Sequence, residues 1–166
     1  CLTQFANVTF PELVKPIDPQ YWKIIEHLLT FEIHKTPVYV KIDFCYKDEN
    51  GVGILDWKTG ESIDVDSDVQ LSCYGLFAHE YFDIPIDKIK MVECNVNTGI
   101  NKTSALIPAK IDFIKHYVTN SIERMRQMLT DVDKNTAEEE NFSFTDNERT
   151  CRFCNYRKIC PKWAGT

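Results

Sequence analysis

Two apolar segments joined by Asn50-Gly51 constrain the fold of this 166-residue chain more than any other feature. In residues 37–46 apolar and polar side chains alternate, which is the period of a strand with one buried face. A second apolar run covers residues 53–58, and Asn-Gly is the pair that two-residue hairpin turns favour. The sequence therefore predicts an antiparallel β-hairpin.

Three charged residues lie near one end of this hairpin. The pairing brings Asp43 of the first strand near Asp56 of the second, and Lys58 shares a strand face with Asp56. Taken alone, residues 54–60 fit an ordinary surface ion pair as well as a metal site. Two carboxylates repel each other at close range unless a cation or a proton lies between them, so the second acid favours the metal site.

The remaining patterns predict an α/β fold with a central mixed sheet. Residues 66–82 and 111–129 have the apolar period of helices that flank the sheet, and residues 88–96 and 102–108 are typical of further strands. Residues 21–30 place apolar side chains at i, i+3, i+4, i+7 and i+8, which predicts a short amphipathic helix. Residues 7–19 contain three prolines and are expected to be irregular, and the acidic residues 131–140 to form a linker.

Composition narrows the functional class. A hydrophobic content of 43% is enough for one buried core, and a net charge of −6 argues against a basic nucleic-acid-binding coat. An enzyme that meets DNA through a local patch and metal ions stays possible. No run of 18 apolar residues and no signal peptide are present, so we expect a cytoplasmic protein with no membrane span. Because the chain starts without methionine, we expect its native N-terminus to be missing.

Three of the seven cysteines form a cluster. Cys151, Cys154 and Cys160 have a Cys-x2-Cys-x5-Cys spacing, in which three thiolates can reach one metal centre. A complete site needs a fourth ligand, for which Cys1 is the best candidate. The other cysteines lie inside predicted elements, where a free cysteine usually packs as a small hydrophobe: Cys45, Cys73 and Cys94. The spacing fits zinc and a four-iron cluster equally well.

Read in order, these motifs resemble the PD-(D/E)XK nuclease superfamily, and most of all its RecB-like branch with iron–sulfur members among helicase-nucleases and CRISPR-adaptation exonucleases. The opening Cys1-Leu-Thr-Gln-Phe5 is similar to the early Cys-Pro-x-x-Phe element of that group. The resemblance covers residues 1–5 and 38–161. The segments that carry it are Ile42-Asp43, Asp56-Trp57-Lys58-Thr59-Gly60, Gln70-Leu71-Ser72-Cys73-Tyr74 and the cysteine cluster.

The resemblance implies a restriction-endonuclease-like core and a metal-dependent deoxyribonuclease, with exonuclease action on DNA ends or single strands. Asp43, Asp56 and the carbonyl of Trp57 would bind Mg²⁺ or Mn²⁺, and Lys58 would orient the attacking water and stabilise the transition state. A helix motif, Gln70 and Tyr74, would contact DNA and support the lysine. A 4Fe–4S cluster, with Zn²⁺ as the alternative, would join the ends of the domain through Cys1, Cys151, Cys154 and Cys160.

We expect residues 1–166 to form a single nuclease domain: an incomplete N-terminal segment 1–36, a catalytic core 37–130 and a cysteine-cluster segment 141–166. Such a protein would be prokaryotic or phage-encoded and would process DNA in recombination, repair, phage or CRISPR pathways, with a helicase or recombination partner. Two other interpretations stay open. One is a catalytically silent module that binds DNA or a helicase, and the other is a zinc-stabilised interaction domain.

One family feature is not matched. The family usually carries a histidine on a helix well before the first aspartate, and His27 is too close in sequence to Asp43 to be that residue. Either this member lacks the histidine, or the segment that carries it is missing from the sequence.

Overall fold

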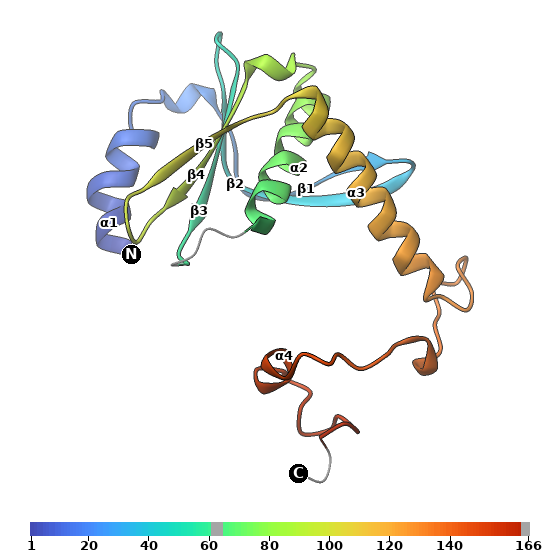
Figure 1. Ribbon diagram of the computed structural model, residues 1–166. Helices are drawn as coiled ribbons and strands as arrows, with labels where there is room; N and C mark the ends of the chain where they lie inside the picture. The colour runs from blue at the N-terminus through green and yellow to red at the C-terminus, as the bar shows by residue number, and fades with distance from the viewer. Residues whose placement is uncertain (61–64, 164–166) are drawn as a thin grey trace. The chain divides into compact units, whose positions relative to one another are not determined.

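A computed structural model describes residues 1–60 and 65–163, without the side chains of residues 65–67. The chain divides into two compact units, Cys1–Thr119 and Asn120–Thr166. Figure 1 shows the course of the chain, coloured by residue number. Within the described part, no helix is both long enough and apolar enough to cross a membrane.

The first unit is built on a five-stranded sheet with the strand order β1-β2-β3-β4-β5. Strands β3 and β4 are parallel, and the other neighbouring pairs are antiparallel. This arrangement confirms the predicted α/β fold with a mixed sheet. The strands are β1 (Trp22–Ile33), β2 (Thr36–Lys47), β3 (Val52–Lys58), β4 (Ile89–Asn95) and β5 (Asn101–Ala105).

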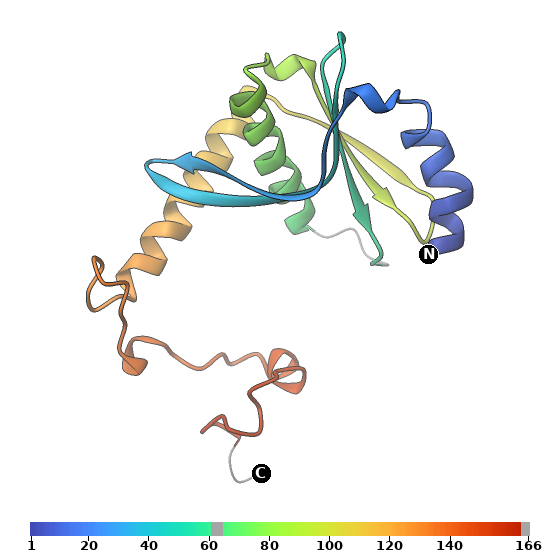
Figure 2. The ribbon, with the colours of Figure 1, turned by 180° about the vertical axis from the view of Figure 1, so that it is seen from behind.

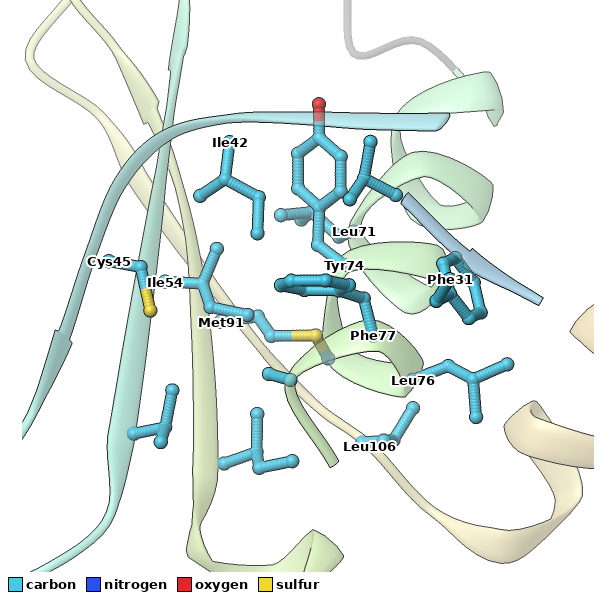
Figure 3. Close-up of a cluster of buried hydrophobic side chains, with 14 of the residues drawn as sticks. Phe31, Ile42, Cys45, Ile54, Leu71, Tyr74, Leu76, Phe77, Met91 and Leu106 are labelled. Carbon is cyan, nitrogen blue, oxygen red and sulfur yellow. The ribbon is translucent and has the colours of Figure 1, made fainter. Parts of the chain in front are cut away.

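One face of this sheet is covered by helices (Figures 1 and 2). Parallel strands need a crossover, and here α2 (Val65–Phe82) and the turn η3 (Ile86–Lys88) connect β3 to β4. The first turns of α3 (Pro108–Gln127) pack on the same face. The largest fully buried side chains fill the space between the layers (Figure 3): Ile42, Ile54, Leu76, Phe77 and Met91.

A second, smaller core lies on the opposite face. There α1 (Leu2–Gln4) continues into the π-helical η1 (Phe5–Val14), and Val14 packs with Phe44, Leu55 and Val92 of the sheet. The prediction that residues 7–19 are irregular is wrong up to Val14. Burial of apolar side chains against the sheet holds this segment helical despite Pro11, and the two later prolines lie outside it. The short 3₁₀ turn η2 (Pro19–Tyr21) then leads into β1.

The predicted amphipathic helix at residues 21–30 is also wrong, because these residues belong to strand β1. Glu26 has a φ of 51°, and the buried face changes phase around it: Ile24 is buried before it, and Phe31 after it. A strand pattern with one such phase shift places apolar residues three and four positions apart, which is also the spacing of an amphipathic helix. The two-residue turn at His34-Lys35, with φ values of 49° and 62°, then pairs β1 with β2.

The other predicted elements of this unit are confirmed with small changes at their ends. The central hairpin forms with Lys47 paired to Val52, and its turn is held by the carboxylate of Asp48, which accepts hydrogen bonds from the amides of Asn50 and Gly51. Helix α2 matches residues 66–82, α3 matches residues 111–129, and β4 and β5 match the two later strands.

The second unit begins inside α3 and has little regular structure. An isolated bridge pairs Asp131 with Thr136, and short helical segments follow at η4 (Glu139–Asn141) and α4 (Glu148–Arg152). The expected linker at residues 131–140 therefore contains a local turn and no long element among the residues described. The predicted division of the chain into nuclease segments stays a prediction.

Candidate active site

The site begins where strands β2 and β3 stop pairing. Their antiparallel ladder ends at Phe44 and Leu55, one residue short of Asp43 and Asp56. Beyond this point, Oδ2 of Asp43 accepts a hydrogen bond of 2.7 Å from the backbone amide of Trp57. The side chain of Asp43 thus takes the place of a backbone acceptor and is fixed beside the end of β3.

The same hydrogen bond shows where the carbonyl of Trp57 points. In an extended strand, the N–H and C=O of one residue face the same neighbouring strand. The amide of Trp57 points to Asp43, whereas the carbonyl of Lys58 accepts from Val96 on the side of β4. The carbonyl of Trp57 therefore faces the side of Asp43, beyond the end of the β2–β3 ladder.

Asp56 is the most deeply buried charged residue of the site, with only 2% of its surface exposed. Its Oδ2 lies 2.8 Å from Nζ of Lys58, yet this oxygen accepts no hydrogen bond with good geometry within the described part of the chain. The ion pair is therefore close but poorly directed. This leaves a buried carboxylate oxygen with capacity for a further ligand.

A chain of polar contacts fixes the position of Lys58. Its ammonium donates a hydrogen bond to Oε1 of Gln70 on α2, and Nε2 of Gln70 donates to the hydroxyl of Tyr74 over 2.8 Å. That hydroxyl donates over 2.6 Å to the carbonyl of Lys41 on β2. Figure 3 shows the ring of Tyr74 within the core. Because both ends of the Gln70 amide are occupied, Lys58 is held from the helix side as well as by Asp56.

Burial controls the ionisation of the two aspartates. Loss of water contact raises the pKa of Asp56, the neighbouring Lys58 opposes this effect, and the charges of Asp43 and Glu93 add to it. Burial also raises the pKa of Asp43, and the hydrogen bond from Trp57 opposes the rise. Asp43 lines an apolar pocket on the η1 side of the sheet, and its other lining residues include Phe5, Phe10, Trp22, Phe44 and Trp57.

These shifts give a stability prediction for the protein without metal. Because the folded pKa of Asp56 lies above its unfolded value of about 3.9, the folded state binds more protons between these two pKa values. The destabilisation by the charged carboxylate is absent below the unfolded pKa and complete above the folded pKa. In EDTA, the difference in melting temperature between wild type and Asp56→Asn should therefore shrink as the pH falls towards 4. A difference that grows towards low pH would contradict this origin of the shift.

Two acids that the sequence patterns do not predict as site residues lie near the aspartates. Glu26 lies on β1 in an ion pair of 2.7 Å with Lys41, and its charge raises the pKa of Asp43. Glu93 pairs in parallel register with Asp56 and is 8% exposed. An acid inside the apolar run of a buried strand is the signal that could have identified Glu93. No comparable signal identifies Glu26, because its position near Asp43 depends on strand β1, where the sequence pattern predicts a helix.

The donor set fits a hard divalent cation. Asp43, Asp56 and the Trp57 carbonyl would supply only oxygen ligands, which Mg²⁺ and Mn²⁺ prefer. Among the described residues, no three His, Cys, Asp or Glu side chains meet closely enough to form a ready-made metal site. Mg²⁺ is usually bound by one or two carboxylates and completed by water and substrate phosphate, so two aspartates and a carbonyl suffice. His27 is exposed on β1 and lies on no helix.

The cysteines divide as their positions in the sequence suggest. Burial raises the pKa of Cys45 and Cys94 to about 12 and that of Cys73 to about 11, so these thiols stay protonated within the core. The described structure does not gather three cysteines into a metal site. Cys1 belongs to the first unit and the cysteine cluster to the second, so their common ligation stays a prediction. The cluster consists of buried Cys151, exposed Cys154 and half-buried Cys160.

The sequence matches a family model over most of its length. Residues 9–161 match the model of the PD-(D/E)XK nuclease superfamily. This range contains both aspartates, the lysine, the helix motif and all three clustered cysteines. No curated protein matches the chain closely enough to count as a relative.

Solved structures show more distant similarity. The crystal structure of SSO0001 is 13% identical, with a TM-score of 0.49 over 96% of this chain and 67% of the other. A provisionally named exonuclease from Eubacterium rectale is 11% identical, with a TM-score of 0.48 over 92% of this chain and 65% of the other. This chain thus spans about two thirds of the length of each, and neither supports a residue-by-residue comparison.

Proposed function

This chain belongs to the PD-(D/E)XK nuclease superfamily, and from that premise we propose that it is a Mg²⁺- or Mn²⁺-dependent deoxyribonuclease that digests DNA from ends or single strands. The observation that carries the proposal is the connected set of Asp43, Asp56 and Lys58 at the end of β3. A surface ion pair would not need a buried aspartate, nor a helix residue that orients the lysine. Exonuclease action and a place in the RecB-like branch rest on the order of the motifs.

Asp43 and Asp56 would hold the metal together with the Trp57 carbonyl. When bound, a divalent cation polarises the scissile phosphate and offsets the charge that develops on its oxygens. The two carboxylates come from different strands: the backbone amide of Trp57 fixes Asp43, and burial beside Lys58 restricts Asp56. The binding oxygens are therefore preorganised, so little reorganisation is needed when the substrate arrives.

Lys58 would act on the attacking water. Its side chain is 30% exposed, so the ammonium reaches solvent while Asp56 and Gln70 fix its direction. A cation in this position can orient a water molecule and stabilise the negative charge of the transition state. Gln70 and Tyr74 would be positioning residues for the lysine, and their place on α2 would also put them near the DNA.

A cleavage assay tests the proposal. Purified protein with Mn²⁺ should degrade end-labelled linear DNA, and EDTA should stop the reaction. A covalently closed circular duplex of the same sequence should resist if cleavage starts at ends. DNA binding without cleavage under Mg²⁺ or Mn²⁺ would overturn the nuclease and support the catalytically silent module instead.

We also propose that Cys1, Cys151, Cys154 and Cys160 bind a 4Fe–4S cluster. The proposal rests on the spacing of the three later cysteines and on the protonated, buried state of the core cysteines, which leaves Cys1 and the cluster as the candidate ligands. A structural metal site commonly forms only when the metal binds. Association with a helicase or recombination partner in the cytoplasm would follow from this branch of the family.

Metal analysis of protein purified without oxygen tests the cluster. Wild type should contain iron and acid-labile sulfide and absorb broadly in the visible range, and a Cys151→Ser, Cys154→Ser double variant should lose both. Cys73→Ala, which changes a cysteine packed against the core, should keep them. Zinc in place of iron would overturn the 4Fe–4S cluster, and protein with neither metal would overturn the cysteine site as a whole.

A further inference from the structure

We propose that Glu93 is a positioning residue of the metal site, where its carboxylate holds a water ligand of the cation that Asp43 and Asp56 bind. The inference rests on the proposed function, because it needs that cation. It adds a third carboxylate, from strand β4, to a site that the sequence predicts on β2 and β3 alone.

The sheet register places Glu93 beside Asp56. The two residues are direct partners in the parallel pairing of β3 and β4, and partners on neighbouring strands project from the same face. The preceding pairs confirm this alternation: Ile54 and Met91 both belong to the larger core, whereas Leu55 and Val92 both belong to the smaller one. Asp56 and Glu93 thus extend the face that α2 covers.

Glu93 is buried and incompletely satisfied. It is 8% exposed, and its Oε2 accepts no hydrogen bond within the described part of the chain. None of the ion pairs among the described residues includes Glu93, although its cross-strand partner on β5 is Lys102. A buried carboxylate oxygen is costly without a donor, so a purely structural role gives no reason for it.

The separation of Asp43 and Glu93 across the sheet favours a role for Glu93 through water rather than as a direct ligand of the metal. Asp43 and Glu93 lie on opposite sides of Asp56, on strands that are two spacings, or about 10 Å, apart. No three acidic side chains of the described residues meet at one point. A metal-bound water extends the reach of the site by one hydrogen bond, about 2.8 Å, and would give Oε2 the donor that it lacks. Partners of this kind fix the ligands around a metal and strengthen its binding.

Calorimetric titration with Mn²⁺ tests this role without depending on catalysis. Glu93→Gln keeps the size of the side chain but removes its charge, and it should weaken Mn²⁺ binding by about 10- to 100-fold. The metal-free melting temperature should be no lower than that of wild type, because Oε2 has no partner to lose. Glu93→Asp, which keeps the charge on a shorter side chain, should bind with intermediate affinity. Glu32→Gln, an exposed acid on β1, should bind as wild type does.

Two results would overturn the inference. Equal Mn²⁺ affinity in Glu93→Gln and wild type would remove Glu93 from the metal site. A clear fall in the metal-free melting temperature of Glu93→Gln would instead give the carboxylate a structural role. Wild type that binds no Mn²⁺ would overturn the proposed function itself, and this result differs from either of the two above.

Discussion

Asp56→Asn is expected to lose at least about 10³-fold of Mn²⁺-dependent DNA cleavage, because removing a metal ligand withdraws several kcal/mol of transition-state stabilisation. Asparagine keeps the shape of the side chain but not the charge that binds the cation. The substitution should also raise the melting temperature of the metal-free protein at neutral pH. Burial raises the pKa of Asp56, so its charged form destabilises the fold above that pKa.

These opposite effects separate a functional role from a structural one. Initial rates on end-labelled DNA measure the first effect, and thermal unfolding in EDTA measures the second. Asp112→Asn, an exposed aspartate on α3, should leave both unchanged. An Asp56→Asn protein that cleaves DNA at the wild-type rate would remove this residue from the catalytic site.

Lys58→Ala should reduce the cleavage rate by about 10²- to 10³-fold, as is typical when one group that stabilises transition-state charge is removed. Its Mn²⁺ affinity should stay at or above the wild-type value, because the ammonium competes with the cation for Oδ2 of Asp56. Single-turnover rates at saturating Mn²⁺ and calorimetric titration measure the two quantities. This combination distinguishes Lys58 from Asp56, whose replacement should weaken both.

The control for this substitution is Lys90→Ala, an exposed lysine on β4. It has the same change in charge and should keep nearly the full cleavage rate. If Lys90→Ala and Lys58→Ala slow the reaction equally, the effect would come from general attraction of DNA rather than from the chemistry at Lys58.

Local patterns predict the centre of the fold and not its edges. The Asn50-Gly51 turn and two alternating runs identify β2 and β3 because hairpin geometry depends on residues close in sequence. The pattern of strand β1 predicts a helix instead, because the phase shift at Glu26 disrupts its alternation. The sequence of η1 predicts irregular chain, because its helical state depends on packing against a sheet formed by residues later in the sequence.

The candidate site shows the same limit. Asp43, Asp56 and Lys58 follow from the hairpin. Helical spacing places Gln70 and Tyr74 on one helix face, and only the family resemblance predicts a role for them in the site. Whether Gln70 faces the lysine depends on the crossover from β3 to α2, which only the structure defines. The apolar run around Glu93 indicates a buried acid, but its place beside Asp56 depends on the parallel register of β3 with β4, which local patterns do not predict.

The arrangement of acids also accounts for how an acidic chain can act on DNA. The net charge of −6 opposes binding to phosphates in general. A cation held between Asp43 and Asp56 would reverse the local field at the end of β3, with Lys58 beside it. DNA affinity should therefore depend on divalent metal.

An anomalous difference map from crystals grown with Mn²⁺ would show whether the end of β3 holds a divalent cation. We expect a peak at ligand distance from the carboxylates of Asp43 and Asp56 and from the carbonyl of Trp57. The peak should be absent from Asp56→Asn crystals grown in the same way. A wild-type map with Mn²⁺ bound elsewhere on the molecule and no peak between these three groups would show that Asp43 and Asp56 do not form the metal site.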